Sequence, residues 1–293
     1  MKESVNNVDI EGIVSEVNLR EIEKGDKKYV AGEVVVMVVD KNGVTNMIPV
    51  GFISADKKKD GTENKNYARL MQLKDFNSIA SAGLEAATKV QIRGAKLQEN
   101  LFLPQNGDTV ISTLRINSNF FTKVNDTNYN PNNSFTLTGS ILAMTAETRT
   151  NADGEAEETG RLIVQMACVG YADKVEVFKL IVENQAHIDF VQANWKVGDT
   201  VRVGGMIKFT EENVEREVEV GFGDAETRSY TRRVRELIIT RGSAGPLDEE
   251  ESYSEEDIKA GLAARKQRMA ELQSKPEVKP AAQGATKFTD ADF

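Results

Sequence analysis

The alternation of hydrophobic and polar residues in the first 121 positions predicts a β-rich region with one helical segment. Valine-rich stretches and short alternating runs indicate five strands, at residues 8–17, 29–39, 44–53, 90–97 and 110–121. Residues 40–43 (Asp-Lys-Asn-Gly) form a turn signal between the second and third strands. Apolar residues recur at helical spacing across residues 67–87. The predicted order is therefore three strands, a helix and two strands.

The same order recurs in the second half of the chain. The pattern predicts strands at residues 135–144, 162–169, 175–182, 201–205 and 234–240, with a short helix at residues 186–195. A glycine lies near the start of the first strand in each copy, at Gly12 and Gly139. The two copies share little residue identity, so the repeat rests on the order of the elements.

The spacing of the elements differs between the copies in two places. The first copy has an insertion near residues 57–69, and the second has a longer connection between its last two strands. Residues 122–133 are polar, rich in Asn and contain Pro131, which is typical of a linker. The sequence thus predicts a first domain (1–121), a linker (122–133), a second domain (134–241), an acidic turn with an amphipathic helix (242–273), and a flexible linker with a tail tip (274–293).

Length and composition narrow the possible functions. The 293 residues suggest about two domains. A single cysteine, Cys168, excludes a disulfide within the chain and a thiolate metal cage, and a single histidine, His187, disfavours acid–base catalysis. We interpret both, and Trp195, as structural residues. The chain contains no run of 18 apolar residues and its start lacks a signal peptide, so we expect a cytoplasmic protein that needs no cofactor.

The charge of the chain is distributed unevenly. The net charge of −9 and the pI near 5.0 argue at first against a nucleic-acid partner. Residues 1–133 are neutral, however, whereas residues 134–241 carry −5 and residues 242–293 carry −4. The objection therefore weakens for the first domain, which we expect to be the main DNA contact.

The doubled order of elements resembles the OB-fold, a five-stranded Greek-key barrel. The segment Gly-Asp-x-Val-x-Val-x-Gly at residues 198–205 is similar to the way many OB-folds enter their fourth strand. The resemblance implies a mainly β fold with two tandem OB-like barrels, a C-terminal helix and a flexible acidic tail. It also implies a groove on strands two and three, edged by the loops between strands one and two and strands four and five, that accepts single-stranded nucleic acid.

A single strand needs flat apolar faces for its bases and Lys or Arg for its phosphates. In the first domain, the groove positions predicted to bind DNA are Lys27, Lys28, Tyr29, Phe52, Lys57, Lys58, Lys59, Arg93, Lys96 and Phe102. Alternatives exist for two of these features. Phe52 can belong to the barrel core, and the lysine run beside Asp56 and Asp60 can be a solvated loop.

In the second domain, the predicted DNA-binding residues are Arg161, Tyr171, Lys174, Lys179, Tyr230, Arg232 and Arg233. Arg232, Arg233 and Arg235 belong to an arginine cluster on the connection into the fifth strand. Arg suits this role because it both pairs with phosphate and stacks on bases. The same connection holds five glutamates within residues 211–219, so the arginines can instead pair with those carboxylates.

The last fifty residues combine an acidic turn, a helix and a polar tail. Ser254 followed by three acidic residues predicts a helix start, and apolar residues recur on one face as far as residue 273. The ending Phe-Thr-Asp-Ala-Asp-Phe resembles the tails of bacterial and phage single-stranded-DNA-binding proteins. It lacks the Pro before the last Phe of the bacterial pattern and is closer to phage versions ending in Asp-Phe. The resemblance implies that Phe293 anchors partner proteins and that Asp290 and Asp292 meet basic residues on them.

These features favour a non-enzymatic protein that coats single-stranded DNA in replication, recombination or repair and recruits partners through its tail. The resemblance further implies a monomer or dimer in the cytoplasm, or in the host cytoplasm if the protein is phage-encoded. The alternative is a tandem β-barrel structural or interaction module that never touches DNA, which the acidic second domain supports. A metal-dependent nuclease is the third hypothesis, although no motif fixes a carboxylate cluster.

Overall fold

The computed structural model describes residues 1–105, 107–150, 154–218 and 226–274, with the backbone alone at 212–218, 226–228 and 230. The first five long strands close into a barrel, in which β1 pairs with β2 and β4, β2 with β3, and β4 with β5. A parallel contact between Gly51 of β3 and Asn117 of β5 completes the ring. The strands are β1 (Asn6–Lys24), β2 (Lys27–Val39), β3 (Thr45–Ala55), β4 (Lys89–Phe102) and β5 (Ile111–Asn117).

A second barrel repeats this pairing. The contact that completes it is again parallel, between Ile181 of β9 and Ile238 of β11. The remaining neighbours, β7–β8, β8–β9, β10–β11 and β7–β10, are antiparallel as in the first barrel. The strands are β7 (Asn132–Thr150), β8 (Ala156–Val169), β9 (Val175–Val182), β10 (Thr200–Val218) and β11 (Glu226–Gly242). The predicted fold class, two tandem OB-like barrels, is confirmed.

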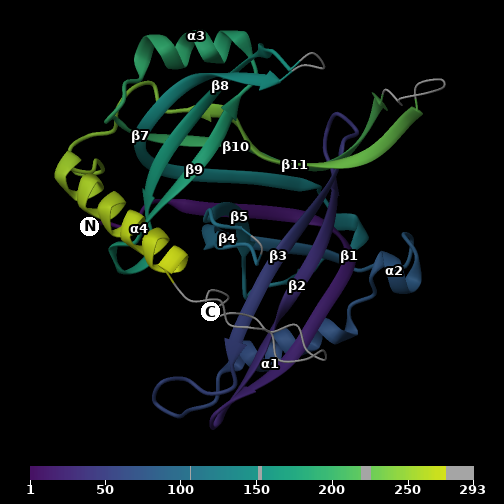
Figure 1. Cartoon of the computed structure of the whole chain (residues 1–293). Coiled ribbons are helices and arrows are strands. Elements are labelled where there is room, and N and C mark those ends of the chain that lie inside the picture. The colour runs from purple at the N-terminus through teal and green to yellow at the C-terminus, as the bar shows by residue number, and fades with distance from the viewer. Residues whose placement is uncertain (106, 151–153, 219–225, 275–293) are drawn as a thin grey trace.

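The two barrels share one continuous sheet rather than meeting only at loops (Figure 1). Strands β1 and β7 pair antiparallel from Asn6 opposite Leu137 to Glu11 opposite Asn132. The buried Asn46 also accepts a hydrogen bond from the backbone N–H of Phe209, at 3.0 Å, which ties β3 to β10. The relative placement of the barrels is therefore fixed by backbone pairing and buried polar contacts.

The predicted linker contains ordered elements. Strand β6 (Thr122–Lys123) pairs with β4, the 3₁₀ turn η2 (Asp126–Asn128) follows it, and β7 already begins at Asn132. The backbone N–H of Asn130 donates to Glu11 at 2.6 Å. The independence of the two predicted domains stays a prediction.

Helices close the open ends of the barrels. Residues 67–87, predicted as one helix, fold as α1 (Lys65–Met71), η1 (Gln72–Asp75) and α2 (Ile79–Ala82), and Leu70 and Leu73 enter the core of the first barrel. In the second barrel α3 (Gln185–Asn194) buries Ile188 and Val191. Each such side chain contributes about 1.5–3 kcal/mol when fully buried. Helices α1 and α3 lie at opposite ends of the molecule (Figure 1).

Two of the three residues interpreted as structural lie in the core. Trp195 is 2% exposed and its indole N–H donates to the Ser243 carbonyl at 3.1 Å. Cys168 is buried, and burial raises the pKa of its thiol. His187 differs, because it lies exposed in the first turn of α3. Among the described residues, no helix has both the length and the apolar character needed to cross a membrane.

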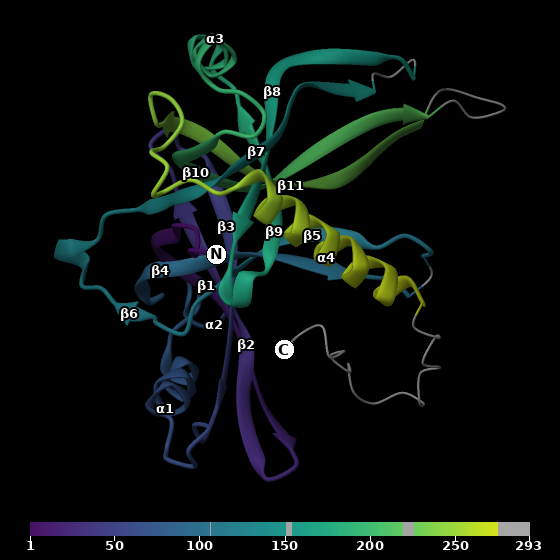
Figure 2. The same cartoon turned by 90° about the vertical axis from the view of Figure 1, so that its left-hand side faces the viewer.

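The connection predicted between the last two strands is itself a long hairpin. Strands β10 and β11 pair from Val203 opposite Gly242 to Val218 opposite Glu226. The hairpin extends away from the barrel, on the same side as the β4–β5 and β7–β8 hairpins (Figure 2). Its outer half pairs charged residues, such as Glu211 with Arg233, across the strands. Such a ribbon lacks the apolar alternation that reveals a strand in sequence.

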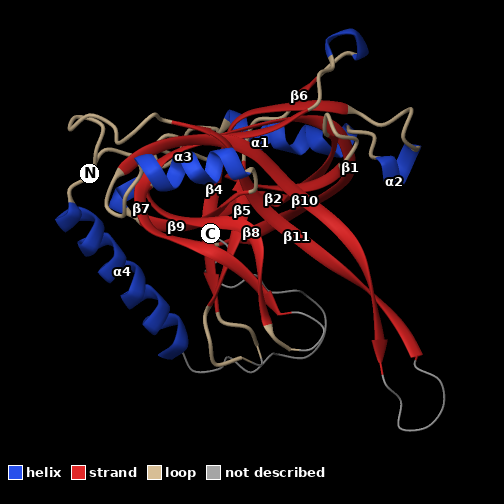
Figure 3. Ribbon diagram, turned by 90° about the horizontal axis from the view of Figure 1, so that it is seen from above, coloured by secondary structure: helices blue, strands red, loops and turns tan. Residues whose placement is uncertain are grey.

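The predicted C-terminal helix is confirmed as α4 (Glu255–Ser274), and Ser254 caps it as predicted, because its hydroxyl accepts a hydrogen bond from the backbone N–H of Asp257 at 3.1 Å. It runs along the outside of the strands on one side of the molecule (Figure 3). Ile258 packs with Ala167, Val169 and Val175 in a small apolar cluster beside the second barrel. The predicted acidic tail, 275–293, lies outside the described residues.

Candidate nucleic-acid interface

Two adjoining cavities mark the face where the barrels meet. The larger, of 1590 Å³, is lined by strands β1 to β5 of the first barrel and by Lys174 and Arg235 of the second. The smaller, of 560 Å³, is lined by β8, β9 and β11 of the second barrel, by β4 and β5, and by Arg265 of α4. The residues that line both cavities are Glu99, Thr113, Leu114 and Arg235. We call the resulting continuous surface the junction groove.

The junction groove is strongly basic. Nine Lys or Arg residues line it, against three carboxylates. The basic residues are Arg20, Lys96, Arg115, Lys174, Lys179, Arg232, Arg233, Arg235 and Arg265, and the acidic ones are Glu33, Glu99 and Glu236. Because the whole chain carries −9, positive charge is concentrated here. A cleft lined by one sign of charge focuses the potential and attracts ligands of the opposite sign.

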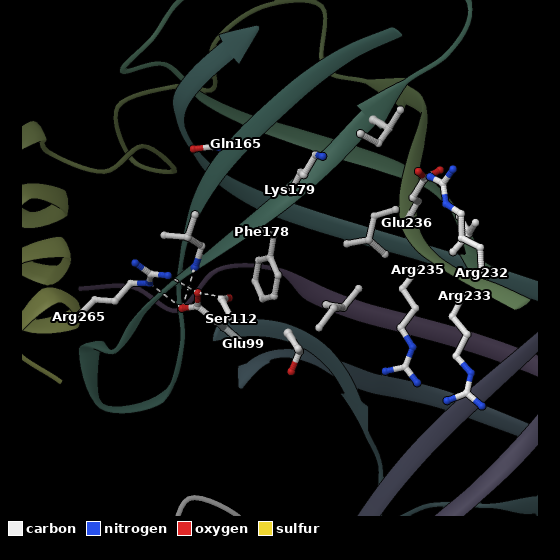
Figure 4. Close-up of a pocket in the computed structure, with 16 residues that line it drawn as sticks. Glu99, Ser112, Gln165, Phe178, Lys179, Arg232, Arg233, Arg235, Glu236 and Arg265 are labelled. Atoms are coloured by element: carbon white, nitrogen blue, oxygen red, sulfur yellow. Dashed lines mark hydrogen bonds and ion pairs between the residues drawn. The ribbon is translucent and has the colours of Figure 1, made fainter. Parts of the chain in front are cut away.

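Strand β11 supplies the densest part of this charge. Arg233 and Arg235, two residues apart, point to the same side of β11 (Figure 4). Arg233 pairs with Glu211 at 3.0 Å, as the alternative of Arg–Glu pairing predicts for this residue. Both side chains are more than half exposed, so the pair is worth only about 0–1 kcal/mol and can yield to a phosphate. Arg235 lies over the Phe209 ring, with its guanidinium 5.7 Å from the ring centroid.

Aromatic rings accompany the basic residues in the first barrel. Phe102, at the end of β4, is half-buried, and Phe120 is 50% exposed with the Arg69 guanidinium 5.6 Å from its ring centroid. Both line the larger cavity. Phe52 also lines it but is only 4% exposed and packs edge-to-face on Phe121. Phe52 is therefore a core residue of the barrel rather than a stacking platform, because an enclosed ring offers no free face to a base.

The groove brings together seven of the seventeen residues predicted to bind DNA: Phe52, Lys96, Phe102, Lys174, Lys179, Arg232 and Arg233. Nine others lie outside both cavities: Lys27, Lys28, Tyr29, Lys57, Lys58, Lys59, Arg93, Arg161 and Tyr171. The lysine run is exposed in the loop after β3, in agreement with the solvated-loop alternative. Tyr171 is 83% exposed at the β8–β9 turn, and the side chain of Tyr230 lies outside the described part of the chain.

Arg161 occupies a structural ion cluster. Its side chain is 13% exposed, and its guanidinium nitrogens lie 2.8 Å from Glu236, 3.3 Å from Glu147 and 3.7 Å from Glu183. Lys179 reaches the same cluster, at 3.9 Å from Glu147, while remaining 56% exposed. An Arg surrounded by three carboxylates has little charge left for phosphate. These surroundings favour a structural role for Arg161 over a DNA contact, whereas the DNA contact at the exposed Lys179 stays a prediction.

Among the basic and aromatic residues of the groove, sequence reasoning did not single out Arg20, Arg115, Phe120 or Arg265. Phe120 fell inside the strand predicted to end at residue 121, but β5 ends at Asn117. The adjacent pair Phe120 and Phe121 was a sequence signal for an exposed ring, because neighbouring side chains in an extended segment point to opposite sides. Phe121 is 8% exposed and Phe120 is 50% exposed, as that rule requires.

Among the described residues, no group of three or more His, Cys, Asp or Glu side chains is placed to hold a metal ion. The acidic groove residue Glu33 is an exposed side chain of β2 that faces two arginines. Partial burial raises its pKa, and the charges of Arg235 and Arg115 oppose the rise.

Comparisons with known proteins identify a family and a fold. The YorF family model matches residues 4–275 of this chain. No curated protein sequence matches it. A deletion mutant of the single-stranded DNA binding protein from Thermus aquaticus has a similar structure, with a TM-score of 0.51, 12% identity, and coverage of 87% of this chain and 100% of that one. The wild-type Thermus aquaticus protein gives a TM-score of 0.49 at 12% identity, covering 84% and 95%. At this identity the likeness concerns the fold.

Proposed function

The chain belongs to the YorF family, and we propose that it is a non-enzymatic protein that binds single-stranded DNA without sequence specificity. The observation that carries the proposal is the junction groove, a basic cleft that crosses both barrels of an acidic chain. A single strand extended along it would meet cationic side chains over its whole path. The Thermus aquaticus protein of similar fold is itself a single-stranded DNA binding protein, which supports the proposal.

The chemistry of the groove favours tolerance of base sequence. Lys and Arg neutralise phosphates, which every nucleotide carries. The exposed ring of Phe120 and the half-buried ring of Phe102 offer stacking faces, and any base can stack on an aromatic ring. The groove therefore combines the two elements that bind a strand irrespective of its sequence.

The alternative function, an interaction module that never touches DNA, predicts acidic residues in the grooves of both barrels. The junction groove has three times as many basic as acidic side chains, which favours the DNA-binding proposal instead. Other carboxylates of the second domain lie outside the groove, for example Glu147 and Glu183, which pair with Arg161. The nuclease hypothesis receives no support from any carboxylate arrangement among the described residues.

The biological role that we propose is to coat and protect DNA exposed in replication or recombination, in the cytoplasm, as a monomer or dimer. The tail would recruit partner proteins through Asp290, Asp292 and Phe293, which follow α4 in the sequence. Deleting residues 290–293 should leave DNA affinity equal or higher, because an acidic tail competes with phosphate for the groove. A large loss of affinity on deletion would count against this role of the tail.

A fluorescence titration tests the DNA-binding proposal. The full chain is titrated with labelled oligo-dT tens of nucleotides long, and separately with a duplex of equal length, at several salt concentrations. We expect tight binding of the single strand at low salt, weakening steeply as salt rises, and weaker binding of the duplex. No binding at low salt, or equal binding of the duplex, would overturn the proposal.

A further inference from the structure

One carboxylate stands at the point where the two cavities of the junction groove meet. Glu99 of β4 lines both cavities, and its side chain is only 2% exposed. An unpaired carboxylate there would repel the phosphates of a strand that passes from one barrel to the other. The neighbouring Glu176 is buried and responds to the charge of Glu99. Burial raises the pKa of Glu176, and the charge of Glu99 raises it further. The Lys174 ammonium, 3.0 Å from the Glu176 carboxylate, opposes this rise.

The C-terminal helix supplies the cation that pairs with Glu99. Arg265 of α4 donates from its Nε to one carboxylate oxygen at 2.8 Å and from a second guanidinium nitrogen to the other oxygen. Ser112 of β5 donates to the same carboxylate at 2.6 Å (Figure 4). Burial opposes ionisation of Glu99, but the hydrogen bonds from Arg265 and Ser112 outweigh it and hold its pKa below the usual range. The carboxylate is therefore charged, and Arg265 balances that charge.

Other contacts of α4 hold Arg265 in this place. Ile258 is 5% exposed in the small apolar cluster, and Gly261 lies so close to Val175 that no side chain fits between them. The Arg268 guanidinium donates to the Val175 carbonyl at 3.1 Å. Near the end of the helix, Gln273 donates to the Asp108 carbonyl in the β4–β5 loop at 3.4 Å. Helix α4 thus contacts both barrels beside the groove.

We infer that α4 is part of the nucleic-acid site, because docked Arg265 neutralises Glu99 and lets one strand pass between the two halves of the junction groove. Arg265 acts here as a positioning residue through Glu99. The inference rests on the proposed function and deepens it. Removing one partner of a buried ion pair leaves an uncompensated charge, so undocking α4 would make the junction repulsive.

The arrangement couples helix docking to DNA binding. Coupling between two binding events is reciprocal, so bound DNA would hold α4 in place, and anything that pulls α4 away would weaken DNA binding. Typical coupling changes affinity about 5- to 150-fold. The residues proposed to bind partners follow α4 in the same chain. A partner that engages these residues and pulls α4 away from Glu99 would therefore weaken DNA binding.

The test uses the full chain and three variants, Arg265→Gln, Glu99→Gln and the double variant, titrated with labelled oligo-dT. We expect Arg265→Gln to weaken binding about tenfold. Glu99→Gln should bind as well as the unaltered chain or better, and the double variant should recover to within about threefold of it. Lys266→Gln is the matched control, because it removes the same charge from an exposed neighbour on α4.

The outcomes separate this inference from the proposed function. If the unaltered chain fails to bind oligo-dT, both fall. If it binds and Arg265→Gln behaves like Lys266→Gln, the inference alone falls. A double variant as weak as Arg265→Gln would also overturn it, because Arg265 would then contact phosphate directly. Circular dichroism at the titration temperature verifies that each variant is folded. Arg265→Lys keeps the positive charge, so it should bind better than Arg265→Gln, and it replaces Arg265→Gln in the test if that variant is unfolded.

Discussion

Arg235 of β11 and Glu33 of β2 belong to different barrels yet line the same cavity, and the charge of Arg235 opposes the rise that burial causes in the pKa of Glu33. The second barrel thus contributes a basic residue to the groove of the first. A strand bound by either barrel would meet side chains from both. The pairing of β1 with β7 makes this possible, because it holds the two barrels in one continuous sheet.

Replacing Arg235 tests the charge of the junction groove. Arg235→Gln should weaken oligo-dT binding about tenfold at low salt, because a charge-assisted hydrogen bond contributes about 1.5 kcal/mol. The slope of log affinity against log salt should fall by about 0.7, the value for one phosphate contact on a single strand. Lys58→Gln is the control, since Lys58 is exposed outside both cavities. A larger loss for Lys58→Gln would place the strand on the lysine loop instead.

Replacing Phe120 tests base stacking. Phe120→Ala should cost about 1–3 kcal/mol of binding free energy, whereas Phe120→Tyr should keep most of it because the ring remains. Phe190→Ala provides a matched control, because Phe190 is 42% exposed on α3 and lines neither cavity. The measurement is the same oligo-dT titration. Equal affinities for the two alanine variants would remove Phe120 from the site.

The docking of α4 can be tested through Gly261. A Cβ atom added there would lie 2.1 Å from a Val175 methyl group, so Gly261→Ala should lower the melting temperature. Helix propensity alone predicts the opposite effect, because Ala in place of Gly within a helix raises the free energy of unfolding by about 1 kcal/mol. The reverse substitution at exposed Ala264, Ala264→Gly, measures propensity without the clash. A rise in melting temperature for Gly261→Ala would show that α4 does not pack on Val175.

The Glu99–Arg265 pair predicts a pH dependence of stability. The pKa of Glu99 is held below its usual range. The contribution of ionised Glu99 to the free energy of unfolding is therefore fully present above the ordinary Glu pKa, and it is lost as pH falls through the lowered pKa. Denaturant unfolding of the unaltered chain and of Glu99→Gln should therefore show a gap in free energy that is constant above about pH 5 and closes in more acidic solution. A gap that widens on acidification would contradict the assigned direction.

Much of the fold follows from local patterns in the sequence. The third strand of the second copy was predicted with the bounds that β9 has, and α3 differs from its prediction by one residue at each end. Strand β9 buries Phe178, Leu180 and Val182 at alternate positions, and α3 buries Ile188 and Val191 three residues apart. The predicted helix over 67–87 instead breaks at Ser78, which caps α2, and at Gly83, whose φ of 81° ends it.

The candidate site was less accessible to sequence reasoning. Which charged residues of a strand face the groove depends on how the barrel closes, and that closure rests on one parallel contact in each barrel. Lys57, Lys58 and Lys59 are conspicuous as a run, yet their loop lies outside both cavities. Arg20, Arg115 and Arg265 lie in three segments far apart in the sequence, and only the tertiary fold brings them to one groove.

Photo-crosslinking tests most directly whether the junction groove holds the strand. The full chain is irradiated with an oligonucleotide that carries 5-iodouracil in place of thymine, and the attached peptides are mapped by mass spectrometry. We predict crosslinks at Phe102 and Phe120 in the first barrel and on β9 and β11 in the second, all competed away by unlabelled oligo-dT. Crosslinks confined to the lysine loop at residues 57–59, or to Arg93 on the outer face of β4, would contradict the account.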